Sequence, residues 1–81
     1  MRLRVKLFAV AKELAGRDNL ELELPAGATI GDLRQSIAAG YPALNQVLSH
    51  ALWAVDAEYA DDDTRLTERS NVALIPPVSG G

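Results

Sequence analysis

Hydrophobic and polar residues alternate in the first stretch of the chain, residues 2–8. In an extended backbone this alternation assigns one side to Leu3, Val5 and Leu7, and the other side to Arg2, Arg4, Lys6 and Phe8. Residues 20–24 repeat the pattern, with leucines inward and Glu21 and Glu23 outward. The acidic side of this second strand can oppose the basic side of the first, and cross-strand charge pairs would help to fix the register. The pattern predicts two half-buried strands.

The period changes to that of a helix after each of these strands. Val10 and Leu14 lie four residues apart in a short segment, residues 8–15, that Gly16 is suited to end. The main helix is predicted to begin after Thr29, a good N-cap residue, with Asp32 completing an imperfect capping box. Its buried face comprises Ile30, Leu33 and Ile37, and it ends at Gly40, Tyr41 and Pro42. A further turn or two of helix is expected over residues 43–49.

Three more strands complete the prediction, over residues 52–55, around Tyr59 and over residues 72–75. Leu66 is expected to fill the core from a turn. The resulting order, β-α-β-α-β-β-β, indicates one α+β domain in which the main helix covers one face of the sheet. We divide the chain into this domain, residues 1–75, and a tail, residues 76–81.

Composition excludes several classes of function. The chain has no cysteine, which rules out disulfides, thiolate metal sites and sulfur chemistry on a side chain. A net charge of −3 argues against nucleic acid as the main partner. No apolar run approaches the roughly 20 residues of a membrane span, and the N-terminus does not resemble a signal peptide, so we expect no membrane association and a cytoplasmic location.

Side chains with catalytic or metal-binding chemistry are sparse. His50 is the only histidine and is better explained as a surface or helix-end residue than as a catalyst. The run Asp61-Asp62-Asp63 lacks the ligand spacing of a calcium loop and is better explained as a solvated turn, so no metal site is expected. The terminal carboxylate of Gly81 is left as the group with an obvious chemical role.

The tail itself has the composition of a segment that enters another protein. It reads Pro76-Pro77-Val78-Ser79-Gly80-Gly81. The prolines stiffen its base, and the two glycines can thread a passage too narrow for other residues. Its extended length is about 18–20 Å. The simpler alternative is a frayed terminus that happens to end in glycine. We expect the tail to add nothing to the core.

Alternation in the last strand places Val72 and Leu74 inward and Ala73 and Ile75 outward. If the first and last strands are parallel neighbours, Phe8 and Ile75 form an apolar patch at the base of the tail. Such a patch on a small acidic domain predicts a partner-binding surface. The alternative is that Phe8 folds under the first short helix.

Three stretches of the sequence carry a family resemblance. They are Leu7-Phe8-Ala9 through Lys12-Glu13-Leu14-Ala15-Gly16, the helix start Thr29-Ile30-Gly31-Asp32-Leu33-Arg34, and Val72 to Gly81, whose Pro-Pro-Val-Ser-Gly-Gly end is the most specific. Through them the whole chain resembles the small subunit of molybdopterin synthase, the MoaD family of ubiquitin-like sulfur carriers. The resemblance implies a β-grasp sheet of about five strands with the first and last strands adjacent and parallel. The turn Glu68-Arg69-Ser70-Asn71 departs from the family pattern, and Asn71 is expected to supply a left-handed conformation there.

The resemblance also implies a mechanism. An E1-like adenylyltransferase would adenylate Gly81 with ATP, and sulfur would replace the adenylate to leave a thiocarboxylate. The large subunit of molybdopterin synthase, with which the family assembles as a heterotetramer, would accept the tail and hold the pterin precursor that receives the sulfur. Gly80 would give clearance, and Pro76 to Ser79 would position the tail. The chain alone would bind no cofactor and would not be catalytic.

Three alternatives remain open on the sequence. The same fold can serve as a sulfur carrier for thiazole synthesis or tRNA thiolation, although the Pro-Pro-Val-Ser segment favours the pterin route. It can serve as a ubiquitin-like modifier that is conjugated to lysines. It can also be a plain binding module with an inert tail.

Overall fold

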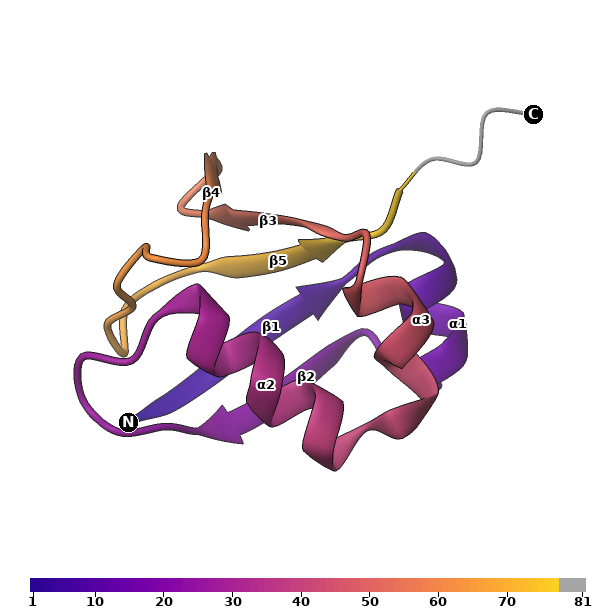
Figure 1. The fold of residues 1–81 in the computed structure, drawn as a ribbon, viewed down its shortest axis with the longest axis horizontal. Helices are drawn as coiled ribbons and strands as arrows, with labels where there is room; N and C mark the ends of the chain where they lie inside the picture. The colour runs from indigo at the N-terminus through magenta and orange to yellow at the C-terminus, as the bar shows by residue number, and fades with distance from the viewer. Residues whose placement is uncertain (78–81) are drawn as a thin grey trace.

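The computed structural model describes residues 1–77, and residues 78–81 lie outside the described part. Its elements are β1 (Arg2–Leu7), α1 (Ala9–Ala15), β2 (Asn19–Glu23), α2 (Ile30–Gly40), the 3₁₀ turn η1 (Pro42–Leu44), α3 (Asn45–Leu48), β3 (Leu52–Val55), β4 (Glu58–Ala60) and β5 (Val72–Ile75) (Figure 1). The predicted order of strands and helices is confirmed. The helical turns expected over residues 43–49 are divided between η1 and α3.

The five strands form one mixed sheet in the order β2-β1-β5-β3-β4. β1 and β5 are parallel neighbours at its centre, and the other pairs are antiparallel. Figure 1 shows α2 lying across one face of this sheet. This is the α+β, β-grasp arrangement that the resemblance implied, with the first and last strands side by side.

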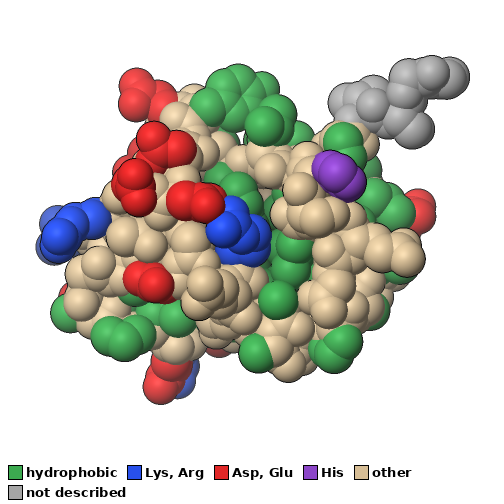
Figure 2. All heavy atoms as spheres, in the orientation of Figure 1, with side chains coloured by type: hydrophobic (Ala, Val, Ile, Leu, Met, Phe, Trp, Pro, Cys, Tyr) green, Lys and Arg blue, Asp and Glu red, His purple; other side chains and the backbone are tan. Residues whose placement is uncertain are grey.

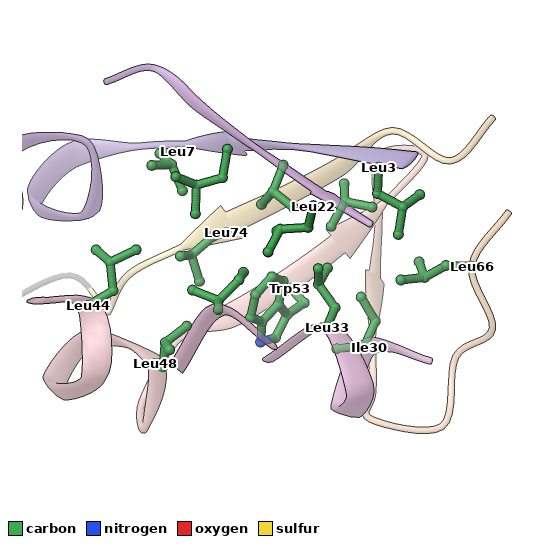
Figure 3. Packing of buried hydrophobic residues seen from close by; sticks show 14 of the residues in the cluster. Leu3, Leu7, Leu22, Ile30, Leu33, Leu44, Leu48, Trp53, Leu66 and Leu74 are labelled. Atoms are coloured by element: carbon green, nitrogen blue, oxygen red, sulfur yellow. The ribbon is translucent and has the colours of Figure 1, made fainter. Parts of the chain in front are cut away.

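The core lies between the sheet and α2. The inward residues of every alternating segment are buried, and their labelled members point toward one another in Figure 3. They include Leu3, Val5, Leu7, Leu20, Leu22, Ile30, Leu33, Ile37, Trp53, Leu66, Val72 and Leu74. Burial of one such side chain contributes about 1.5–3 kcal/mol, so the alternation fixes which face of each strand is inside.

The helix ends are formed by the residues that the sequence indicated. Thr29 Oγ1 accepts a hydrogen bond from the backbone N–H of Asp32 at 3.3 Å, and Asp32 Oδ2 accepts one from the N–H of Thr29 at 3.0 Å. The capping box of α2 is therefore complete rather than imperfect. Gly16 ends α1 in the left-handed conformation, with φ of 72°.

The short helix α1 departs from expectation in the side that it buries. Val10 and Leu14, whose spacing predicted the helix, are 41% and 44% exposed, whereas Ala11 is fully buried. α1 packs against η1 and β5. Ala11 is its buried residue, and Ala15 packs against the core. The apolar pair therefore marks the solvent side of this helix.

In the described part of the chain the non-glycine residues with positive φ are Ala9, Asp56 and Ala57, so the prediction for Asn71 is wrong. Asp56 and Ala57 have φ of 52° and 70°, as a two-residue hairpin turn requires. Asn71 is not one of the residues with a positive φ. It holds the turn instead: its N–H donates to Asp56 Oδ1 at 2.9 Å, and its carbonyl accepts from the N–H of Asp56 at 2.8 Å.

Candidate functional site

The predicted surface at the base of the tail forms where β1 and β5 end together. Leu7 lies beside Leu74 in the parallel register. Phe8 keeps an extended backbone, with φ of −126° and ψ of 153°, so its side chain points to the opposite face from Leu7. One further step of the register places Phe8 next to Ile75. Phe8 is 40% exposed and Ile75 is partly exposed, so the alternative that Phe8 folds under the helix is wrong.

Two exposed side chains that were not predicted extend this surface across the sheet. Leu52 lies directly opposite Ile75 in the β3–β5 pair and is 53% exposed. Tyr59 lies opposite Ala54 in the β3–β4 pair and is 77% exposed. We call Phe8, Leu52, Tyr59 and Ile75 the outer apolar patch. The alternation of Leu52 with buried Trp53 was a signal for its outward direction, but its neighbours depended on the order of the strands.

Charged side chains occupy the rest of the outer face. The predicted cross-strand pairs form, because Arg2 and Arg4 each contact a glutamate of β2 at 3.0 Å, Glu23 and Glu21 respectively. Exposed pairs of this kind contribute roughly 0–1 kcal/mol each, so they help to set the register more than the stability. A shallow groove of about 680 Å³ runs over this face, between β1, β2 and the residues that lead into β5.

The base of the tail is part of the folded domain. Pro76 is buried and Pro77 is exposed. The expectation that the tail adds nothing to the core is therefore wrong at Pro76. Val78, Ser79, Gly80 and Gly81 lie outside the described residues, and their predicted roles stay predictions.

The remaining candidates are His50 and the acidic run at residues 61–63. His50 is exposed just beyond α3. Acidic side chains gather near β4 and the loop after it (Figure 2), but within residues 1–77 no three His, Cys, Asp or Glu side chains are grouped so as to hold a metal ion. The loop uses its carboxylates locally. Asp61 Oδ1 accepts from the N–H of Asp63 at 3.0 Å, and Asp62 Oδ2 accepts from Arg34 at 2.7 Å.

This ion pair has an electrostatic consequence. The hydrogen bond from the Arg34 guanidinium lowers the pKa of Asp62, and the same contact raises the pKa of Arg34. The pair joins α2 to the loop before Leu66, where the N–H groups of Ile30 and Gly31 also donate to loop carbonyls. The Arg34–Asp62 pair thus stabilises the position of this loop against α2. In the described part of the chain, no helix is long and apolar enough to cross a membrane.

Comparison with known proteins accounts for the combination of a β-grasp domain and a Gly-Gly end. The model of the ThiS family matches residues 5–81, which is nearly the whole chain. The chain belongs to the ThiS family. It is 39% identical to the molybdopterin synthase sulfur carrier subunit of Chlamydomonas reinhardtii, over all of both chains. It is 36% identical to that of Arabidopsis thaliana, over all of this chain and 84% of the relative.

Solved structures agree on the fold. The crystal structure of small archaeal modifier protein 1 from Haloferax volcanii superposes with a TM-score of 0.88 at 29% identity, over all of both chains. Subunits of the molybdopterin-converting factor of Helicobacter pylori, solved as a complex of subunits 1 and 2, include a chain with a TM-score of 0.73 at 24% identity, again over all of both chains. The second likeness supports the fold alone. Together they confirm the β-grasp architecture.

Proposed function

We propose that this chain is the sulfur carrier subunit of a molybdopterin synthase. The observation that carries the proposal is its full-length similarity to sulfur carrier subunits, at 39% identity over all of both chains in the algal relative. Gly81 bears the transferred sulfur as a thiocarboxylate, and a pterin precursor held by a large subunit receives it. Because the chain has no cysteine, its own terminus is the available carrier of sulfur.

The chemistry at Gly81 requires activation by another protein. A carboxylate is a poor electrophile, so an E1-like adenylyltransferase first joins it to AMP from ATP and releases pyrophosphate. A sulfur donor then displaces AMP and leaves the thiocarboxylate. The proposal includes the cytoplasm as the compartment. No cofactor is assigned to this chain, since ATP and the pterin precursor are held by its partners.

The folded domain provides the surface that binds the partner and sets the direction in which the tail leaves the sheet. Phe8 and Ile75, with Leu52 and Tyr59 beside them, form an exposed apolar patch next to the point where the tail leaves the sheet. A large subunit that covers this patch would receive the tail at the same time, and two such pairs would form the heterotetramer. The buried Pro76 anchors the base, so less conformational freedom is lost on insertion.

The test is mass spectrometry of the protein after incubation with its activating enzyme, ATP and a sulfur source. The proposal expects the mass increase of an oxygen-to-sulfur exchange, located at Gly81 by fragmentation. The loaded protein, mixed with the large subunit and the pterin precursor, should then lose that sulfur. If Gly81 acquires sulfur but passes it to a thiazole precursor or to tRNA and not to the pterin, the chain serves one of the other thiolation pathways instead.

A protein modifier is the second candidate, and it rests on a likeness of fold. The likeness to small archaeal modifier protein 1, with a TM-score of 0.88, covers the whole chain. This candidate expects isopeptide adducts between Gly81 and lysines of other proteins in cell extract. Their absence, together with sulfur loading, would leave the carrier role alone.

A further inference from the structure

Lys6 is a cation on the outer face that the pairing of β1 with β2 leaves uncompensated. The two preceding outward residues of β1 form the ion pairs Arg2–Glu23 and Arg4–Glu21. The third, Lys6, lies opposite Asn19, which carries no charge. Within residues 1–77, Lys6 forms no ion pair. Charge compensation along β1 therefore stops at the end of the strand that lies beside the outer apolar patch.

The row of residues that crosses the sheet from Lys6 has small side chains in its middle. Its neighbour on β5 is Ala73, whose partner on β3 is Ala54, and Tyr59 of β4 follows in the same row. Small side chains thus lie between two large ones. Lys6, Ala54 and Ala73 also line the groove on the outer face. The two alanines form a low floor that an extended segment of another protein can approach closely.

The ammonium group of Lys6 has a defined place. Its Nζ lies 5.3 Å from the centroid of the Phe8 ring, which is within the range of a cation–π contact. The cation is therefore held at the border of the outer apolar patch. A side chain that is already held loses less freedom when a partner binds.

We propose that the protein that receives the tail places an Asp or Glu carboxylate against Lys6, on a segment that lies along the alanine floor. This inference rests on the proposed function and specifies the chemistry of the partner. A partner that covered the patch with apolar groups alone would bury Lys6 without a counter-ion, which is costly. A carboxylate removes that cost, and the attraction speeds association and selects against partners without it.

The experiment measures the dissociation constant for the molybdopterin synthase large subunit of the same organism at low and at high salt. Lys6→Glu reverses the charge, and Lys6→Met removes it but keeps an apolar stem over Phe8. Arg17→Glu is the matched control, because Arg17 is exposed, lies outside the groove and forms no ion pair among the described residues. Thermal unfolding of each variant checks that the domain remains folded.

At low salt we expect Lys6→Glu to weaken binding about tenfold or more and Lys6→Met about threefold, with Arg17→Glu within about twofold of wild type. High salt should reduce the effect of both Lys6 variants, because mobile ions screen the attraction. Wild-type binding with equal effects of Lys6→Glu and Arg17→Glu, or with losses independent of salt, would overturn this inference alone. Absence of wild-type binding would overturn the proposed function and the inference together.

Discussion

Leu52 lies directly opposite Ile75 in the β3–β5 pair, and both side chains point away from the core. This relationship joins a residue from the middle of the chain to the last residue of the sheet. It converts the predicted pair of Phe8 and Ile75 into a surface that spans neighbouring strands at the base of the tail. Because Leu52 is 53% exposed, it can be altered with little effect on folding.

Leu52→Asp is therefore expected to separate binding from stability. Since Leu52 is 53% exposed, we expect the free energy of unfolding to change by less than about 0.5 kcal/mol. Binding to the large subunit should weaken by about 1–2 kcal/mol, as measured by titration calorimetry. Leu14→Asp is the matched control, because Leu14 is 44% exposed on α1, outside the outer apolar patch. Equal loss of affinity in both variants would argue against the patch as the docking surface.

Deletion of Gly81 should abolish sulfur loading while the domain stays folded. The reacting carboxylate is then displaced by one residue, and rates of transfer fall steeply with such misplacement, by about 100-fold or more. Among residues 1–77 the buried residue nearest this end is Pro76, which the deletion leaves in place. Thermal unfolding by circular dichroism and mass spectrometry after loading measure the two effects. Sulfur transfer by the truncated protein at the wild-type rate would contradict the role of Gly81.

Ala57→Gly is expected to stabilise the domain. Ala57 has φ of 70° in the hairpin turn between β3 and β4, where a Cβ is strained and glycine is not. Relief of this strain exceeds the entropy that glycine adds to the unfolded chain, so we expect a gain of about 0.5–1 kcal/mol in urea unfolding. Ala54→Gly, in β3, is the control and should destabilise. A lower midpoint for Ala57→Gly would show that the turn is not strained.

The Arg34–Asp62 pair should make stability depend on acid pH. Hydrogen bonding to Arg34 lowers the pKa of Asp62 in the folded state. Its contribution is therefore present above the unfolded pKa, about 4, and is lost as the pH falls through the folded value. Asp62→Asn should be less stable than wild type at neutral pH, and the two stability curves should converge in acid. Asp63→Asn is the control, and parallel curves for Asp62→Asn and wild type would count against the pair.

The candidate site was predictable only in part. Phe8 and Ile75 were found from alternation, because a strand of period two assigns each side chain to a face. Leu52 was missed, since its position opposite Ile75 depends on β3 lying beside β5, and Tyr59 was missed, since its position depends on the β3–β4 hairpin. The role of Asn71 was wrong for a related reason. A left-handed position is set by the geometry of a particular turn, and here that turn is the one at Asp56 and Ala57.

The sequence by itself determined the faces of the strands, the helix ends and the Gly-Gly end, because these follow from local periodicity and from the intrinsic properties of residues such as Thr29 and Gly16. Only the tertiary structure decided which outward residues become neighbours. It placed Leu52 beside Ile75, buried Pro76 and set Lys6 opposite Asn19. The physical reason is that the order of the strands depends on contacts between segments far apart in the chain, which the local alternation of each strand does not encode.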